Sequence, residues 1–130
     1  MRVLFLTYFI CFLANGTSCV IPEKQFDKWN VKYGSLIKVE VSNNLNEYFV
    51  LATLPREIEG LKLNYVILHQ GQPNPTFSAQ LATFEEDGEL KTAYTTNNIR
   101  IKDNMLTVGF GRGCGIDVSV AVALKSKYNK

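Results

Sequence analysis

The chain has 130 residues, of which 46% are hydrophobic and 20% charged, and its formal net charge is +2. This length fits one domain, since domains usually contain roughly 100–150 residues. The small net charge excludes the broadly basic surface that nucleic-acid binding needs, so we expect no nucleic-acid partner. The ordinary charged fraction excludes a disordered acidic or basic tail.

The N-terminal segment predicts secretion. Arg2 precedes an unbroken apolar run over residues 3–13, and small or polar residues follow as far as Cys19. Such a run is typical of a signal peptide, whereas a membrane span needs about 20 apolar residues. We therefore expect residues 1–18 to be a signal peptide, cleaved after Ser18 or after Cys19. Residues 19–130 should then form a single extracellular domain without a membrane span.

The cleavage position decides how the three cysteines are used. Cys11 lies inside the expected signal peptide. If Cys19 is retained, it can pair with Cys114 in the oxidising secretory pathway, closing a loop of about 95 residues and adding about 4–5 kcal/mol of stability in the chain-entropy model. If Cys19 is removed, Cys114 is left as a buried thiol or forms a disulfide-linked dimer. We favour the intramolecular pair and a monomer.

Along the rest of the chain, hydrophobic residues recur with a period of two. Residues 22–29 are the main helical candidate, and a turn is expected at 55–60. Asp87 and Gly88 predict a hairpin, because both residues tolerate positive φ. Strands are predicted over residues 37–41, 48–54, 61–69, 76–84, 90–96, 99–102, 105–110 and 116–124. Seven or eight short strands separated by turn signals predict an all-β fold, an antiparallel β-sandwich of the jelly-roll or lectin-like kind.

Catalytic and metal chemistry finds little support in the sequence. His69 is the only histidine, and no nucleophile motif accompanies it, so we expect no enzyme, with a small secreted hydrolase that uses His69 as an alternative. One histidine and at most two retained cysteines are too few for a four-ligand zinc site. We expect no metal and no cofactor. A calcium site is the alternative to a solvated turn for four neighbouring acidic residues: Glu85, Glu86, Asp87 and Glu89.

The glycine-rich segment 109–115 superficially resembles a phosphate-binding loop. A nucleotide loop requires a helix after it, whereas a strand pattern follows here. We therefore interpret the segment as a hairpin in which glycines permit positive φ. Arg112 at its tip is a candidate contact for an anionic or sugar ligand.

The remaining binding candidates are polar loops and one aromatic residue. The 70–76 segment is rich in amides, and Gln70, Gln72 and Asn74 are the predicted ligand contacts, with Arg112 beside them if the glycine hairpin shares that edge. Its alternative interpretation is a connection stiffened by two prolines. Trp29, the only tryptophan, either stacks on a ligand or belongs to the core.

Three segments resemble the extracellular β-sandwich module known as the farnesoic acid O-methyltransferase-like domain. Residues 38–41 with 48–52 resemble its opening strand pair, and residues 98–109 resemble a strand, an Asp-Asn turn and a further strand. Residues 65–68, followed by Gly71, Asn74 and Ser78, resemble its Tyr-x-Ile strand and the stretch after it. The resemblance implies a lectin-like sandwich used for recognition rather than for methyl transfer.

The sequence thus predicts a secreted, non-enzymatic recognition protein that binds a glycan or another extracellular ligand through its loops. The alternative is a secreted effector, such as a component of venom or saliva or a pathogen factor, that binds a host protein. An exposed apolar patch would favour the effector, and a shallow polar groove would favour the glycan.

Overall fold

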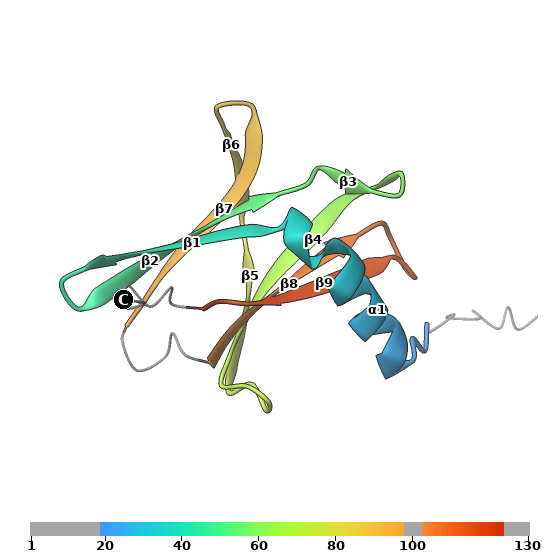
Figure 1. The fold of residues 1–130 in the computed structure, drawn as a ribbon, viewed down its shortest axis with the longest axis horizontal. Helices are drawn as coiled ribbons and strands as arrows, with labels where there is room; N and C mark the ends of the chain where they lie inside the picture. Colours follow the sequence, from blue (N-terminus) through green and yellow to red (C-terminus); the bar gives the residue numbers. More distant parts are fainter. Residues whose placement is uncertain (1–18, 98–102, 124–130) are drawn as a thin grey trace, which may run out of the picture.

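The computed structural model describes residues 19–97 and 103–123, so the predicted signal peptide and the predicted strand at 99–102 lie outside the described residues. Within these residues the fold is mostly β, which confirms the all-β prediction (Figure 1). The elements, in chain order, are α1 (Glu23–Tyr33), the short 3₁₀ helix η1 (Gly34–Leu36), β1 (Lys38–Asn44), β2 (Glu47–Leu54), β3 (Glu57–Ile58), β4 (Leu61–Gln70), β5 (Phe77–Leu81), β6 (Thr83–Glu86), β7 (Glu89–Asn97), β8 (Asn104–Phe110) and β9 (Ile116–Ala121).

The strands form two antiparallel sheets. One has the order β1-β2-β7-β6, and the other has the order β3-β4-β8-β9 with β5 also paired to β4. Only Ala82 separates β5 from β6, so one nearly continuous strand passes from the second sheet to the first. Thr92 is buried at this corner, and its Oγ1 donates a hydrogen bond of 2.8 Å to the Ala82 carbonyl oxygen. The described chain is therefore a sandwich whose two sheets meet along one side.

The core lies between the sheets and follows the predicted period of two. On β2, Val50, Ala52 and Leu54 are buried, while the residues between them are more exposed. Alternate residues of β8 and β9 face them from the second sheet, including Leu106, Val108, Phe110 and Val118. Burying a valine or leucine side chain contributes roughly 1.5–3 kcal/mol, so this row of apolar residues fixes which face of each strand is inside.

The β4 strand departs from the predicted alternation. The sequence pattern places Leu61, Leu63, Tyr65 and Ile67 on one face, but the β4–β8 register shifts between Leu63 and Tyr65. Beyond this bulge, Val66 and Leu68 are the buried residues, so Tyr65 and Ile67 turn to the outer face. A bulge inserts one residue and exchanges the faces of the strand, which a uniform period of two does not anticipate.

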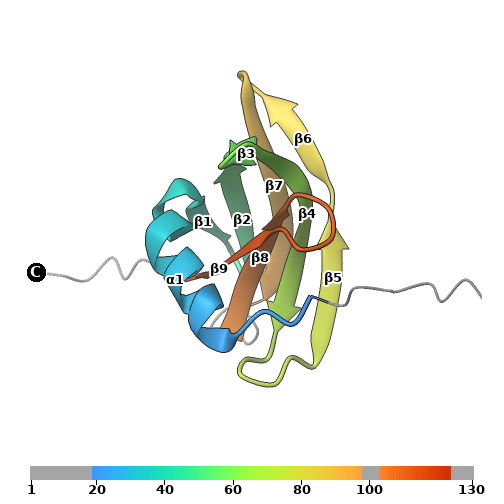
Figure 2. The same ribbon diagram turned by 90° about the vertical axis from the view of Figure 1, so that its right-hand side faces the viewer.

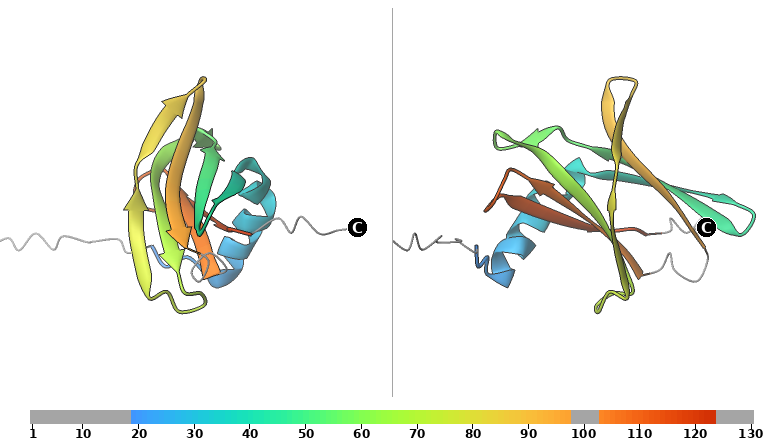
Figure 3. Two further views of the ribbon diagram at one scale, coloured as in Figure 1. Left: turned by 90° about the vertical axis from the view of Figure 1, so that its left-hand side faces the viewer. Right: turned by 180° about the vertical axis from the view of Figure 1, so that it is seen from behind.

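Helix α1 closes the side of the sandwich opposite the β5–β6 corner (Figures 2 and 3). The helix extends beyond the predicted 22–29 segment to Tyr33, because its inward face continues through Trp29 to that residue. The Asn30 Oδ1 accepts a hydrogen bond of 2.7 Å from the Ser119 backbone N–H on β9. Among the described strands β9 pairs with β8 alone, so this bond covers part of the outer edge of β9.

The end of α1 is also anchored to the tight turn between β3 and β4. The Tyr33 hydroxyl donates a hydrogen bond to Glu59 Oε1, and Lys32 Nζ lies 3.0 Å from the same oxygen. The hydrogen bond from Tyr33 and then the Lys32 ammonium lower the pKa of the Glu59 carboxyl. The segment 55–60, predicted as a turn, therefore contains the two-residue strand β3 and a turn that contacts the C-terminal end of α1.

The Asp87 and Gly88 hairpin and the disulfide confirm two local predictions. Asp87 and Gly88 have φ of 53° and 77° and connect β6 to β7. Cys19 is bonded to Cys114 with a Cα–Cα distance of 5.5 Å, which ties the segment before α1 to the β8–β9 loop. The intramolecular pairing expected for a chain that retains Cys19 is therefore present.

Candidate functional site

The predicted ligand contacts fall at opposite ends of β4. The 70–76 loop follows the last residue of β4, whereas the β8–β9 loop that carries Arg112 lies near its first residues. The register pairs Leu63 with Phe110 and Gln70 with Asn104, two rows roughly 23 Å apart along the strand at about 3.3 Å per residue. Arg112 therefore does not share an edge with Gln70, Gln72 and Asn74.

Within the 70–76 loop the three amides have different surroundings. Gln70 is buried, and its Nε2 donates a hydrogen bond of 3.2 Å to Thr96 Oγ1 on the other sheet. Gln72 is half-buried and Asn74 is exposed. The loop is held by bonds from the Gly71 N–H to the Asp103 carbonyl, 3.1 Å, and from Thr76 N–H to the Gln70 carbonyl, 2.9 Å. Gln70 thus links the two sheets, and Asn74 is the amide that solvent reaches most freely.

The aromatic candidate and the single histidine are both occupied by intramolecular contacts. Trp29 is half-buried against the core, and its ring meets that of Phe26 edge to face with centroids 5.8 Å apart. His69 lies on the outer face of β4, with its Nδ1 2.8 Å from Ser78 Oγ on β5. The ring contact lies within α1, whereas the His69–Ser78 contact joins β4 to β5.

Three acidic residues around the β6–β7 hairpin, Glu85, Glu86 and Glu89, are paired with cations. Arg56 Nη1 lies 2.5 Å from Glu85 Oε1, and Arg56 Nη2 donates to the Gly88 carbonyl at 3.2 Å. The hydrogen bond from Arg56 lowers the pKa of the Glu85 carboxyl. Lys91 Nζ is 3.0 Å from Glu86 and 3.7 Å from Glu89. Among the described residues, no group of three or more His, Cys, Asp or Glu side chains is placed to hold a metal ion.

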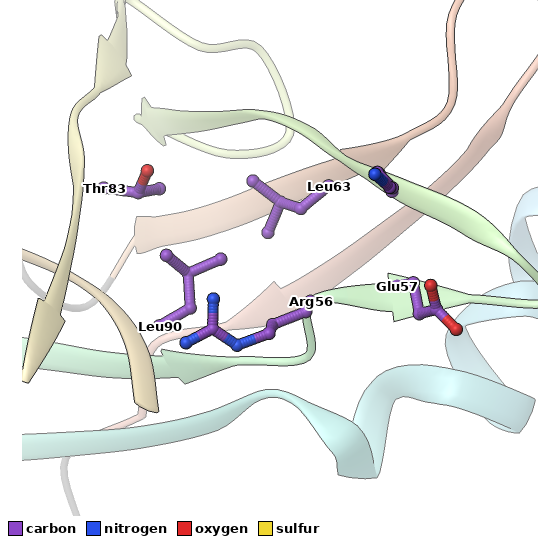
Figure 4. Close-up of a pocket in the computed structure, with 6 residues that line it drawn as sticks. Arg56, Glu57, Leu63, Thr83 and Leu90 are labelled. Carbon is purple, nitrogen blue, oxygen red and sulfur yellow. The ribbon is translucent and has the colours of Figure 1, made fainter. Parts of the chain in front are cut away.

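Two adjoining depressions lie at the end of β4 where the strand begins. The first, which we call the inter-sheet groove, has a volume of about 420 Å³ (Figure 4). Leu63 and Leu90 form its apolar floor, because their register partners Phe110 and Leu54 belong to the core. The groove is lined by Arg56, Glu57, Lys62, Leu63, Thr83 and Leu90.

The second depression, which we call the cationic hollow, has a volume of about 320 Å³. It lies between the β3–β4 turn and the β8–β9 loop, and it shares Lys62 and Leu63 with the inter-sheet groove. Its lining residues are Gly60, Leu61, Lys62, Leu63, Asn64, Gly111 and Arg112. Two cations, one amide and two glycines therefore border one open surface.

The backbone of the β8–β9 loop is fixed against β4. The Gly111 N–H donates to the Lys62 carbonyl at 2.8 Å, and Gly111 has φ of 82°. A Cβ added at Gly115 would lie 1.8 Å from the Phe110 carbonyl oxygen, so this position admits only glycine. Together with the disulfide at Cys114, these constraints hold Arg112 beside the first residues of β4. Positive φ at Gly111 and Gly113 confirms the predicted role of these two glycines.

The cations at this end of the molecule differ in whether they have partners. Lys32, Arg56 and Lys91 each pair with a carboxylate. Over residues 19–97 and 103–123, by contrast, the exposed side chains of Lys62 and Arg112 make no hydrogen bond or ion pair. Glu57 stands opposite Lys62 in the β3–β4 ladder, but no ion pair joins them within that part of the chain. Both cations of the cationic hollow are therefore available to a ligand.

Sequence reasoning identified Arg112 but missed Lys62 and Asn64. Both residues lie in a predicted strand, where an exposed polar residue is ordinary, and only the β4–β8 pairing brings them to the Arg112 loop. The alternation of Leu61 and Leu63 around Lys62 places Lys62 on the outside, but it does not show which loop it faces. Tertiary pairing supplies that information.

Comparison of this chain with protein-family models, curated proteins and solved structures finds no match. The resemblance to the farnesoic acid O-methyltransferase-like domain stays a prediction. No helix in the described part of the chain is long and apolar enough to cross a membrane.

Proposed function

We propose that this protein is a secreted, non-enzymatic recognition protein that binds an acidic glycan at the cationic hollow. The observation that carries the proposal is that Lys62 and Arg112, which make no ion pair over residues 19–97 and 103–123, border the same hollow, whereas Lys32, Arg56 and Lys91 each pair with a carboxylate. A guanidinium binds a carboxylate or sulfate in a bidentate way, and an ammonium adds a second point charge. The Asn64 amide borders the same hollow and can bond a sugar hydroxyl.

The Cys19–Cys114 disulfide supports an extracellular location, because disulfides persist in oxidising compartments and are rare in the cytosol. Residues 1–18 are the proposed signal peptide. N-terminal sequencing of the protein released by secreting cells tests this point. A first residue at position 19 is expected, whereas an intact N-terminus in the medium would contradict it.

A glycan array that contains sulfated, uronic-acid, sialylated and neutral sugars tests the ligand class. Saturable binding is expected for the acidic members alone, and the affinity should fall as salt is raised, because the contacts are exposed charges. Equal binding of neutral and acidic members would contradict the proposal. A silent array with intact circular dichroism would contradict glycan recognition as a whole.

Paired variants locate the site. Lys62→Gln and Arg112→Gln keep the side-chain length roughly similar while removing charge, and together they should weaken binding at least tenfold. Lys38→Gln removes an exposed lysine from β1 and serves as the matched control. If the double variant binds as the native chain does, the cationic hollow is not the site. Asn74→Ala tests the 70–76 loop separately and should leave the affinity unchanged.

A host-protein-binding effector is the second candidate, because the outer face of the four-stranded sheet exposes large aromatic rings. Phe49 on β2 and Phe84 on β6 remain 43% and 42% exposed. Scattered exposed aromatics are common on soluble proteins, but two on one sheet face fit a protein contact. Phe49→Ser would then abolish capture of a protein partner and leave glycan binding intact.

A further inference from the structure

The inter-sheet groove adjoins the cationic hollow and has no ligand assigned to it so far. Lys62 and Leu63 border both depressions, so a ligand whose acid group is held at the hollow also meets the groove. The groove has a volume of about 420 Å³ and the hollow about 320 Å³. Both volumes fall within the range of roughly 300–1,000 Å³ that is usual for small-molecule sites. The groove is therefore large enough to hold part of the same ligand.

The floor of the groove is apolar and open to solvent. Leu63 on β4 and Leu90 on β7 are half-buried, whereas their register partners Phe110 and Leu54 are buried in the core. Figure 4 shows both leucine side chains directed toward the same space between the sheets. Covering this exposed apolar surface is favourable because it removes the surface from water. The floor therefore favours a ligand that has an apolar group.

Two polar side chains stand beside this floor. The Arg56 guanidinium lies near Leu90 in Figure 4, where Glu85 at 2.5 Å and the Gly88 carbonyl at 3.2 Å hold it. A guanidinium carries further N–H donors, and these remain for a ligand. Over residues 19–97 and 103–123, the exposed Thr83 hydroxyl makes no hydrogen bond. The groove thus offers N–H donors and a hydroxyl at the border of an apolar surface.

The walls of the groove are held by hydrogen bonds of the scaffold. The Leu63 N–H donates to the Arg56 carbonyl at 2.8 Å, which ties the floor to one wall. Thr83, on the opposite wall, is the register partner of Thr92, whose hydroxyl donates to the Ala82 carbonyl at 2.8 Å. A preformed site has little ordering entropy to lose when it binds. The groove therefore selects a ligand whose chemistry matches its own.

We propose that the acidic glycan carries an N-acetyl group near its acid group, and that this N-acetyl group occupies the inter-sheet groove. The inference rests on the proposed function, because the cationic hollow holds the acid group. An acetamido group has a methyl for the leucine floor, a carbonyl oxygen that accepts from Arg56 and an N–H that donates to the Thr83 hydroxyl. A sugar hydroxyl in its place has no apolar part to cover Leu63 and Leu90. The ligand class is N-acetylated acidic sugars, whose acid group is a carboxylate, as in sialic acids, or a sulfate ester.

Two matched pairs of sugars test the inference on the secreted, oxidised protein. The methyl glycosides of N-acetylneuraminic acid and of its 5-hydroxy analogue form one pair, and those of N-acetylglucosamine 6-sulfate and glucose 6-sulfate form the other. Each pair keeps the acid group and exchanges acetamido for hydroxyl. In at least one pair the acetylated member should bind at least about tenfold more tightly, because a methyl in an apolar pocket and paired polar groups discriminate by this much. The pair that shows the preference identifies the acid group as carboxylate or sulfate.

The outcomes separate this inference from the proposed function. Equal affinities within both pairs would overturn the inference and leave acidic-glycan binding in place. Binding of neither pair by a protein that binds other acidic sugars on the array would have the same meaning. If no acidic sugar binds at all, the proposed function fails and the inference fails with it.

Variants distinguish the groove from the hollow. Thr83→Val removes the hydroxyl while keeping the side-chain shape, and it should lower the preference for the acetylated sugar without changing the affinity for the hydroxy analogue. Thr95→Val, on the outer face of β7, is the matched control and should change neither. Lys62→Gln combined with Arg112→Gln should weaken both members of a pair alike, since both carry the acid group. A preference that Thr83→Val leaves unchanged would overturn the placement in the groove.

The acetyl methyl group gives a readout that needs no variant. In NMR spectra recorded at saturation, nuclear Overhauser contacts are expected between its protons and the methyl groups of Leu63 and Leu90. Contacts to Phe49 or to the 70–76 loop in their place would locate the acetyl group elsewhere and overturn the inference.

Discussion

The ring of Tyr65 on β4 lies close against the backbone of Gly109, its register partner on β8. Beyond Gly109, the Tyr65 hydroxyl donates a hydrogen bond to Asp117 Oδ1 on β9, so one side chain spans three strands. A Cβ built on Gly109 would come within 2.2 Å of Tyr65 Cζ. Gly109 is therefore required for the close approach of the ring, although its φ is not positive.

Replacing Gly109 tests this contact. Gly109→Ala should destabilise the fold by about 1–3 kcal/mol, the usual cost of forcing extra atoms into a packed position. The free energy of unfolding in urea measures the effect. Gly34→Ala is the control, because a Cβ at Gly34 meets its nearest neighbour, Val120 Cγ1, at an ordinary 3.8 Å. Similar stabilities of the two variants would show that the Tyr65 ring moves aside at little cost.

The Tyr65 hydroxyl should make stability depend on alkaline pH. Burial first, and then the hydrogen bond to Asp117, raise the pKa of Tyr65 well above its ordinary value of 10.0. The unfolded chain therefore loses the tyrosine proton at lower pH than the folded chain does. This contribution to stability is complete below about pH 10 and is lost as the pH rises toward the folded-state pKa. Tyr65→Phe should flatten that decline in unfolding measurements between pH 9 and 12, the range that brackets the ordinary value.

Tyr94 provides an internal comparison for that experiment. Burial also raises the pKa of Tyr94, with an opposing contribution from its bond to Asn104. Tyr94→Phe should remove a further part of the alkaline decline. If neither variant changes the slope, the two phenols ionise equally easily in the folded and unfolded chains.

The bond between Asn30 and Ser119 should protect one edge of the second sheet. Asn30→Ala leaves the Ser119 backbone N–H without its partner, and we expect a loss of about 1–2 kcal/mol and faster hydrogen exchange at Ser119. Exchange rates measured by NMR on native and variant protein test this directly. Unchanged exchange at Ser119 would show that packing of α1, rather than the Asn30 side chain, shields the edge.

Removing the Cys19–Cys114 disulfide should lower stability by about 4–5 kcal/mol if loop-closure entropy dominates. A chain carrying both Cys19→Ser and Cys114→Ser, compared with the oxidised protein in urea, measures this difference. Reduction should raise the intact mass of the native protein by two hydrogens and leave the variant unchanged. A native mass that reduction does not alter would contradict the bridge.

Local signals were sufficient for most of the fold. Strand β2 is identified by its alternating Val50, Ala52 and Leu54, and the hairpin by Asp87 and Gly88. Both patterns could be recognised because they depend only on residues close together in the sequence. The bulge before Tyr65 was missed, since it depends on how β4 meets β8. The same holds for the single strand that serves both sheets, which the sequence pattern presents only as one segment at 76–84.

The candidate site was predictable only in part, for a related reason. Arg112 was found because glycines around it mark an exposed turn. Its neighbours Lys62 and Asn64 are distant in the sequence, and only the antiparallel pairing of β4 with β8 brings them together. Gln70 was predicted as a ligand contact at the surface. Beyond the bulge, however, the even-numbered residues of β4 point into the core, so Gln70 is buried against Thr96. The strand pairing decides which residues lie beside Arg112, and the face of the strand on which a residue lies decides whether Gln70 is buried; residue type alone shows neither.

The short link at Ala82 bears on how the molecule comes apart. The strand that runs through Ala82 pairs with β4 in one sheet and with β7 in the other. Separating one sheet from the molecule therefore also removes a paired strand from the other sheet. The two layers should therefore lose protection of their amides in one cooperative opening, with β2 and β8 exchanging at the same global rate. In this architecture the corner makes two sheets behave as a single unit of unfolding.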